Sequence, residues 1–199
     1  MPRLSEDRFA LDLHAWRHGD QDAGDRLYAT AYDELKDVAS RALRSLGRGD
    51  QLQTTALVHE CYLKLVASGS IGAESRNHFL ALCARAMRQI IVDSARRQLA
   101  EKRGAGPAWR VTLSESDGDA ATPETLDPEA IAMLDQTLSE LDRREPRLAR
   151  IAECRIFGGL DTAEIAATFA VTERTVQREW LRVKALLALV LGAREGHAT

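Results

Sequence analysis

Residues 161–187 read DTAEIAATFAVTERTVQREWLRVKALL, and this stretch decides the fold of the C-terminal part of the chain. Asp161 and Thr172 are residue types that cap helix N-termini, and each precedes a run with apolar residues at helical spacing. Ala170, Val171 and Thr172 form a three-residue turn between the two runs. A short helix, a tight turn and a longer helix make a helix-turn-helix, an arrangement that many DNA-binding proteins share.

The second helix of this motif has two different faces. Its apolar residues recur at spacings of 4, 3 and 4 and therefore lie on one side: Val176, Trp180, Val183 and Leu187. Three arginines lie roughly opposite them: Arg174, Arg178 and Arg182. Arginine pairs bidentately with guanine edges and also binds phosphates, while the neighbouring Glu173 and Gln177 suit cytosine and adenine. The alternative is an amphipathic helix of a bundle, with arginines that only confer solubility.

Residues 76–103 predict a second basic helix, RNHFLALCARAMRQIIVDSARRQLAEKR. Its apolar stripe consists of Phe79, Cys83, Met87 and Ile90. Arg85, Arg96 and Arg103 lie on another side of the helix, because spacings of 11 and 7 residues place them within about 20° of one another around the helix axis. Arg88 lies beside this row. Residues 76–110 contain eight basic and only two acidic groups, whereas ordinary exposed helices mix the two signs. A cationic surface is favoured over a merely solvated helix.

The net charge of −3 hides a very uneven distribution of charge. Residues 111–142 carry nine acidic groups and no basic one, while residues 143–199 carry ten basic and seven acidic groups. A phosphate backbone responds to the local field, so the basic regions matter more than the average. Residues 104–128 are rich in Gly, Pro, Ser, Thr and acids and predict a linker. This linker would join an N-terminal domain, 5–103, to a C-terminal domain, 129–192.

The composition favours an all-α fold, because aromatic residues make up only 5% while Ala, Leu and Arg abound. The predicted helices cover about 5–17, 22–46, 52–67, 76–103, 129–141, 146–157, 162–169 and 173–191. The N-terminus lacks the apolar core of a secretory signal, and no window suits a membrane span, so we expect a cytoplasmic protein with no membrane partner. Three cysteines lie in apolar helical patterns and predict buried free thiols: Cys61, Cys83 and Cys154.

The sequence contains no recognisable catalytic motif. We find no P-loop, Gly-rich dinucleotide loop, nucleophile elbow or HExxH. His14 and His18 are four residues apart, and His59 is near Cys61, but a metal site needs more ligands at suitable spacing. We therefore expect no metal and no cofactor. A metalloenzyme stays a third hypothesis, which a stoichiometric zinc signal from purified protein would revive.

Three segments, in order, resemble one family. TALVHECYLKLV (55–66) resembles the polymerase-binding helix of extracytoplasmic-function (ECF) sigma factors of the sigma-70 type. Residues 76–106 resemble the following helix, which handles the −10 element, and residues 141–180 resemble the C-terminal domain that binds the −35 element. The resemblance covers about residues 5–191. It implies an all-α fold in which a region 2 bundle and a region 4 helix-turn-helix are joined by an acidic linker.

The resemblance also implies roles for individual residues. The protein would be a non-enzymatic factor that binds core RNA polymerase, through the clamp helices of the largest subunit and the flap, and directs initiation at promoter DNA. The clamp helices would meet Leu57, Val58, His59, Glu60, Leu63 and Lys64. The −10 element would meet Asn77, Arg85, Arg88, Arg96 and Arg97. The −35 element would meet Glu173, Arg174, Gln177, Arg178 and Arg182. An anti-sigma factor is a further partner that the family allows.

The main alternative is an ordinary helix-turn-helix regulator with an N-terminal sensing or dimerisation domain. A run-off assay with core polymerase separates the two hypotheses, because only a sigma factor gives initiation that depends on this protein alone. The alternation of basic and acidic segments suggests a further hypothesis. This hypothesis is that in the free protein the two predicted domains pack together through the acidic linker, which masks the basic helices.

Overall fold

Eight α-helices, and no strand, form the regular structure of the described residues, which are 6–46, 51–67, 73, 75–102 and 128–192 of a computed structural model. In chain order they are α1 (Glu6–Arg17), α2 (Gln21–Ser45), α3 (Gln51–Ala67), α4 (Arg76–Lys102), α5 (Pro128–Arg144), α6 (Pro146–Ile156), α7 (Thr162–Phe169) and α8 (Glu173–Gly192). The all-α prediction is confirmed. The predicted linker, apart from Pro128, lies outside the described residues, so the division into two domains stays a prediction.

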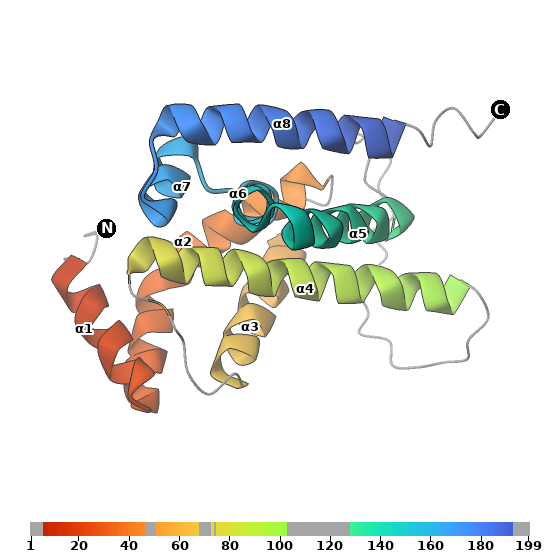
Figure 1. Ribbon diagram of the computed structural model, residues 1–199. Coiled ribbons are helices and arrows are strands. Elements are labelled where there is room, and N and C mark those ends of the chain that lie inside the picture. The colour runs from red at the N-terminus through yellow and green to blue at the C-terminus, as the bar shows by residue number, and fades with distance from the viewer. Residues whose placement is uncertain (1–5, 47–50, 68–72, 74, 103–127, 193–199) are drawn as a thin grey trace.

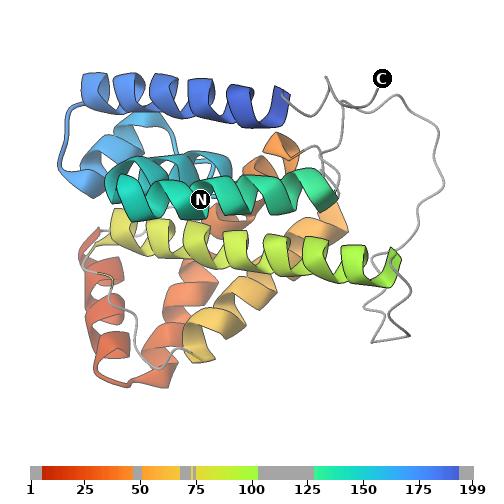
Figure 2. The same cartoon turned by 45° about the vertical axis from the view of Figure 1, so that its right-hand side comes forward.

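The long helix α4 lies in the middle of the molecule. Figures 1 and 2 show α1 on one side of it and α5–α8 on the other, with α8 outermost, while α2 and α3 cross behind it. α4 contacts α1, α2 and α3, and it also contacts α5, α6 and α7. The basic helix predicted from the sequence is therefore enclosed from two sides.

One continuous cluster of buried side chains runs through both halves of the described structure. In α4, Phe79, Cys83 and Met87 are buried as the apolar stripe predicts, and Ile90 is partly buried. The ring of Phe79 packs edge-on against Phe9 of α1, with 5.6 Å between ring centroids. The remaining helices contribute further apolar side chains to the same cluster, among them Leu27, Leu138, Ile151, Phe157, Ile165 and Val183. Burial of this apolar surface stabilises the helices as one packed body.

The three cysteines are buried and unbridged, which confirms the prediction of buried free thiols. The Sγ atom of Cys61 on α3 lies 3.7 Å from the carbonyl oxygen of Cys83 on α4. Burial raises the pKa of the Cys83 thiol and raises that of Cys154 to about 12. These thiols thus behave as small apolar groups of the core.

Candidate nucleic-acid interface

The helix-turn-helix predicted at residues 161–187 is present as α7, a short turn and α8. Asp161 accepts a hydrogen bond from the Glu164 N–H at 2.8 Å, and the Glu164 carboxylate accepts one from the Asp161 N–H at 2.8 Å. This reciprocal capping box begins α7. Thr172 accepts a hydrogen bond from the Thr175 N–H at 3.2 Å at the start of α8. Local side-chain caps therefore fix where both helices of the motif begin.

The turn between α7 and α8 passes through a left-handed residue. Ala170 has φ 51° and ψ 44°, and its N–H donates to the carbonyl oxygen of Ala166. Among the described non-glycine residues, Ala170 alone has a positive φ. Glycine is the usual residue at such a helix C-cap, because a Cβ atom is strained there. The sequence places alanine at this strained position.

Replacing Ala170 with glycine should therefore stabilise the protein. Relief of the left-handed strain, about 1–2 kcal/mol, outweighs the extra backbone entropy of glycine in the unfolded chain, about 0.4–1 kcal/mol. We expect the free energy of unfolding to rise by up to about 1.6 kcal/mol in urea denaturation. Ala167→Gly, at an exposed position inside α7, is the matched control and should lower it. A loss of stability in Ala170→Gly would contradict the assigned backbone conformation.

The N-terminal half of α8 presents polar side chains to solvent. Val176 and Val183 are buried and Trp180 is partly buried, so the apolar side faces inward as predicted. The exposed residues include four of those predicted for the −35 element: Glu173, Arg174, Gln177 and Arg178. Arg174 and Arg178 have no carboxylate within ion-pair distance among the described residues. Their guanidinium groups are available to an external ligand.

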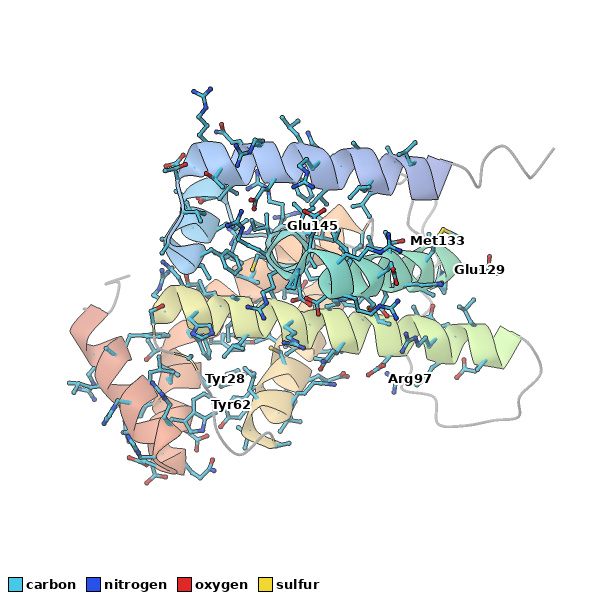
Figure 3. The ribbon with its side chains drawn as sticks, viewed as in Figure 1. Tyr28, Tyr62, Arg97, Glu129, Met133 and Glu145 are labelled. Atoms are coloured by element: carbon cyan, nitrogen blue, oxygen red, sulfur yellow. The ribbon has the colours of Figure 1, made fainter. Side chains whose placement is uncertain are left out.

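Arg182 differs from the other two arginines of this row. Its Nη2 atom donates to both carboxylate oxygens of Glu145, at 2.9 and 2.8 Å. Glu145 lies at the corner between α5 and α6, where Figure 3 labels it beneath α8. Arg182 is still half exposed, but part of its hydrogen-bonding capacity is already used. Arg174 and Arg178 are therefore neighbouring cations without an ion-pair partner in the described part of the chain, whereas Arg182 is tied to the body of the protein.

The sequence reasoning missed one buried charged residue of α8, Glu179. Glu179 is only 4% exposed, and its Oε1 atom pairs with Arg147 of α6. Its Oε2 atom is buried without a hydrogen-bond partner among the described residues. A signal was present, because Glu179 lies three residues after Val176 and four before Val183, on the apolar side of the helix. This ion pair and the Arg182–Glu145 pair both hold α8 on α6.

The arginines predicted for the −10 element divide into two groups in the structure. Arg85 and Arg97 are exposed, and Asn77 is partly exposed. Arg97 points away from α5 in Figure 3. Arg88 and Arg96 instead form ion pairs with side chains of the α5–α6 region. Phe79, the single aromatic residue of α4, is buried, so α4 offers cations rather than an aromatic stacking surface.

Arg88 is the most enclosed of these arginines, with a side chain only 12% exposed. Its Nε atom donates to Asp135 Oδ1 at 2.9 Å, and its Nη1 atom donates to Glu153 Oε1 at 3.2 Å. Its Nη2 atom donates to the main-chain oxygen of Asp135 and to Ser139 Oγ, both at 3.0 Å. Burial raises the pKa of the Glu153 carboxyl, while the nearby Arg88 opposes that shift. Arg96 donates to the other oxygen of Asp135 at 2.9 Å.

The helix α3 has an inner and an outer side. Leu57 and Val58 are buried in the core, whereas His59, Glu60 and Leu63 are exposed and Lys64 is partly exposed. A groove of about 560 Å³ lies between this outer side and α4, lined by Glu60, Leu63, Lys64, Ile90, Asp93, Arg96 and Arg97. Leu63 is 51% exposed and adds an apolar side chain to the otherwise mostly charged lining of this groove. A partner would therefore reach α3 through its last four predicted residues, while Leu57 and Val58 hold the helix in place.

A tyrosine stack fixes α3 against α2. The rings of Tyr28 and Tyr62 lie 4.1 Å apart between centroids, and Figure 3 labels both below α4. The Tyr62 hydroxyl donates to Asp25. Burial, together with this carboxylate, raises the pKa of Tyr62 to about 12. These contacts with α2 thus fix the orientation of α3 and of its outer side.

The histidines considered for metal binding do not form a metal site in the described structure. His14 and His18 lie close together, with ring centroids 4.5 Å apart. Within the described ranges, no group of three or more His, Cys, Asp or Glu side chains is arranged to hold a metal ion. Two imidazoles alone do not make a protein metal site.

A model of the ECF sigma factor family matches residues 7–190. The chain belongs to the ECF sigma factor family. A separate search of curated proteins found no match. ECF sigma factors act in promoter-directed transcription initiation, bind core RNA polymerase and promoter DNA, and are not a catalytic family.

The extent of this match separates the two main hypotheses. It runs from α1 to α8 and thus includes α3 and α4 as well as the helix-turn-helix. An ordinary regulator with an unrelated N-terminal domain would match the family model only in its C-terminal helix-turn-helix. In the part of this ECF sigma factor that the structure describes, no helix has the length and apolar character needed to cross a membrane.

Proposed function

We propose that this ECF sigma factor uses three separate surfaces to direct core RNA polymerase to its promoters. The outer side of α3 binds the clamp helices of the largest polymerase subunit, through His59, Glu60, Leu63 and Lys64. The basic side of α4 binds the −10 region, and the start of α8 reads the −35 duplex. The observation that carries the proposal is the pair Arg174 and Arg178, exposed and without ion-pair partners in the described structure, above a buried apolar seam.

The geometry of α8 supports the −35 assignment. The exposed side chains come from its first three turns, and the N-terminal end of a recognition helix is the part that reaches base edges in the major groove. Arg174 and Arg178 are four residues apart and therefore adjacent on one face. Glu145 and Glu179 hold the rest of the helix against α6. A helix fixed from behind presents its arginines in one orientation, which favours sequence readout over loose charge attraction.

The −10 assignment draws on α4. Arg85 and Arg97 are exposed, and few acidic side chains of this helix oppose them. A cationic groove of this kind suits the phosphates of a separated strand. Arg88 and Arg96 join this surface once they are released from the carboxylates that now hold them.

The test of this function is run-off transcription with purified core polymerase and a pool of promoter fragments. Initiation from a defined subset of fragments, absent without the protein, supports the proposal. Binding to duplex DNA without any initiation would instead support a helix-turn-helix regulator. The start sites obtained also define the −10 and −35 sequences needed for the experiments below.

Leu63 provides a specific test of the polymerase-binding surface. Leu63→Asp should weaken binding to core polymerase tenfold or more, because burying a leucine side chain contributes about 1.5–3 kcal/mol. Affinity is measured by fluorescence anisotropy of the labelled protein titrated with core enzyme. The matched control is Leu11→Asp on α1, where a leucine is 67% exposed on a surface with no proposed partner. Equal affinities of the two variants would remove α3 from the proposed interface.

A further inference from the structure

The carboxylate of Glu179 is buried within the apolar seam by which α8 packs on the rest of the protein. Around the helix axis, Glu179 lies within about 60° of Val176 and of Val183, both of which are buried. Its Oε1 atom pairs with Arg147 of α6, and its Oε2 atom is buried without a hydrogen-bond partner in the described part of the chain. An apolar side chain at this position would stabilise the fold at least as well, because it would leave no buried polar atom unsatisfied.

The ion pair and the apolar seam constrain α8 in different ways. Apolar contacts are not directional, so valine side chains tolerate small rotations and shifts of the helix that carries them. A guanidinium donates only along fixed directions in its plane, so the pair with Arg147 is lost when the carboxylate of Glu179 moves away from those directions. The side chain of Arg147 is 58% exposed and that of Glu179 is 5% exposed, so the arginine reaches inward to a buried acceptor. The pair thus selects one rotational setting of α8 among those that the seam allows.

Two further contacts hold the same turn of α8. Arg182 donates to both carboxylate oxygens of Glu145, at the corner where α6 begins. The guanidinium carbon of Arg155 on α6 lies 5.9 Å from the ring centroid of Trp180, a cation–π contact. Around the helix axis, Glu179 lies between Arg182 on one flank and Trp180 on the other. The turn that contains Glu179 is therefore the point at which α6 holds α8.

A small rotation of α8 about this turn would displace the exposed arginines. Arg174 and Arg178 lie about 140° and 100° around the axis from Glu179, on the side away from the seam. A helix is about 10–12 Å wide with its side chains, so a rotation of about 20° moves a surface group by about 2 Å. Hydrogen bonds to base edges tolerate only about 0.5 Å in distance. Such a rotation breaks base contacts, whereas attraction to the phosphates persists.

We propose that Glu179 determines the −35 specificity of this sigma factor, because its buried pair with Arg147 fixes the rotation of α8 and thereby the base edges that Arg174 and Arg178 reach. Glu179 is a positioning residue, which acts through the two arginines and does not itself touch DNA. The inference rests on the proposed role of α8 as the −35 reader. Without the pair, α8 stays folded and cationic but discriminates less between sequences.

The test measures promoter selectivity within a single reaction. Core polymerase with each full-length variant transcribes two run-off templates together, the native promoter and one with the −35 base pair changed whose change affects wild type most. The ratio of the two transcripts does not depend on how much of the protein is folded, so a purely structural defect leaves it unchanged. We expect a ratio of about fivefold to 150-fold for wild type, and a ratio at least about fivefold smaller for Glu179→Met. A wild-type ratio in Glu179→Met would overturn the proposal.

The matched control, Val183→Ala, alters the same seam but leaves the ion pair in place. It shortens a buried side chain, so it should lower the melting temperature while the transcript ratio stays within about twofold of wild type. Glu179→Met should melt at or above wild type, because it removes an unsatisfied buried oxygen and leaves an arginine that is already half exposed. Stability and selectivity should thus change in opposite ways in the two variants. An equal loss of selectivity in both would mean that the apolar seam orients α8, and the proposal would fall.

Adding Arg147→Met to Glu179→Met tests the pair as a unit. The double variant has the net charge of wild type and should show the same transcript ratio as Glu179→Met, since the two side chains act through one contact. A further decrease in the ratio would mean that Arg147 acts on DNA separately, against the proposal. Should Glu179→Met fail to fold, the double variant, in which two apolar side chains replace the pair, carries the same test.

The behaviour of wild type separates failure of this inference from failure of the proposed function. If wild type initiates with no preference among −35 sequences, α8 is not the −35 reader and the proposed function of that surface fails. If wild type shows the preference and Glu179→Met retains it, the −35 assignment stands and the role of Glu179 is rejected.

Discussion

Replacing both Arg174 and Arg178 with alanine should abolish promoter-specific initiation while the protein stays folded. Each arginine that pairs with a base edge contributes about 1–3 kcal/mol, so the double variant should lose about 2–6 kcal/mol of −35 binding. This loss corresponds to a decrease in affinity of about 30-fold to 10⁴-fold. Both side chains are exposed and have no described ion-pair partner, so their removal leaves no buried charge behind. The measurement is run-off transcription, together with binding to a −35 duplex.

The matched control for this experiment is Lys184→Ala. Lys184 is exposed on the same helix but lies about 120° around it from the centre of the arginine row. The single variants then separate two kinds of contact. A base contact makes the loss depend on the −35 sequence, whereas a phosphate contact weakens all sequences alike and reduces the slope of binding against salt. Normal initiation by the double variant would exclude the start of α8 as the −35 reader.

Replacing Phe157 with alanine should remove a large part of the stability of the protein. Phe157 caps the C-terminus of α6, and its side chain is fully buried. Truncation of a buried phenylalanine costs about 3–5 kcal/mol, because apolar contacts are lost and a cavity remains. Whole domains are stable by only about 5–15 kcal/mol, so the melting temperature should fall by many degrees. Calorimetry or circular dichroism of the full chain measures this change.

Two companion variants show whether the core is energetically continuous. Phe169→Ala on α7 is the control, since this phenylalanine is only partly buried and should cost less. Phe79→Ala truncates a buried ring on α4, in the same cluster as Phe157. We expect Phe79→Ala and Phe157→Ala to shift one shared unfolding transition. Two transitions that respond separately would mean that the contact across α4 does not couple the halves.

Much of the fold was predictable because helices leave a strong periodic signal. The predicted ends of all eight helices lie within three residues of those observed. Local chemistry explains this accuracy, since Asp161, Thr172 and the left-handed Ala170 act on their immediate neighbours. The apolar stripe that begins at Phe79 and the seam through Val176 also face inward as their spacing indicates.

The candidate site was predictable only in part. Periodicity gives the side of a helix on which a residue lies, but it does not say which other element will cover that side. Arg88 and Asp135 are 47 residues apart, so nothing local relates them. The hypothesis that the two domains pack together through the acidic linker stays a prediction, because that linker, apart from Pro128, lies outside the described residues, and the carboxylates that pair with Arg88 come from α5 and α6 instead. Arg85, Arg174 and Arg178 stay exposed, so the cationic surfaces on which the assignment depends are still present.

Two further differences have physical reasons. Leu57 and Val58 were assigned to the polymerase contact together with the exposed residues of the same helix. Both side chains face the core, so they are not accessible to a partner. Glu179 was overlooked because a charged residue is normally expected outside. Its burial is tolerated because Arg147 supplies the opposite charge.

The buried thiols have a practical consequence for observing motion in this protein. Thiol reagents attack the thiolate, and burial raises the pKa of the Cys83 thiol and that of Cys154 to about 12. Cys61 is equally enclosed between α3 and α4. A cysteine introduced on the surface of α4 and another on α5 would therefore take up dyes selectively, with the native cysteines left in place. Fluorescence energy transfer between the two dyes would show whether the distance between α4 and α5 changes as polymerase is added, in real time and in the otherwise unaltered chain.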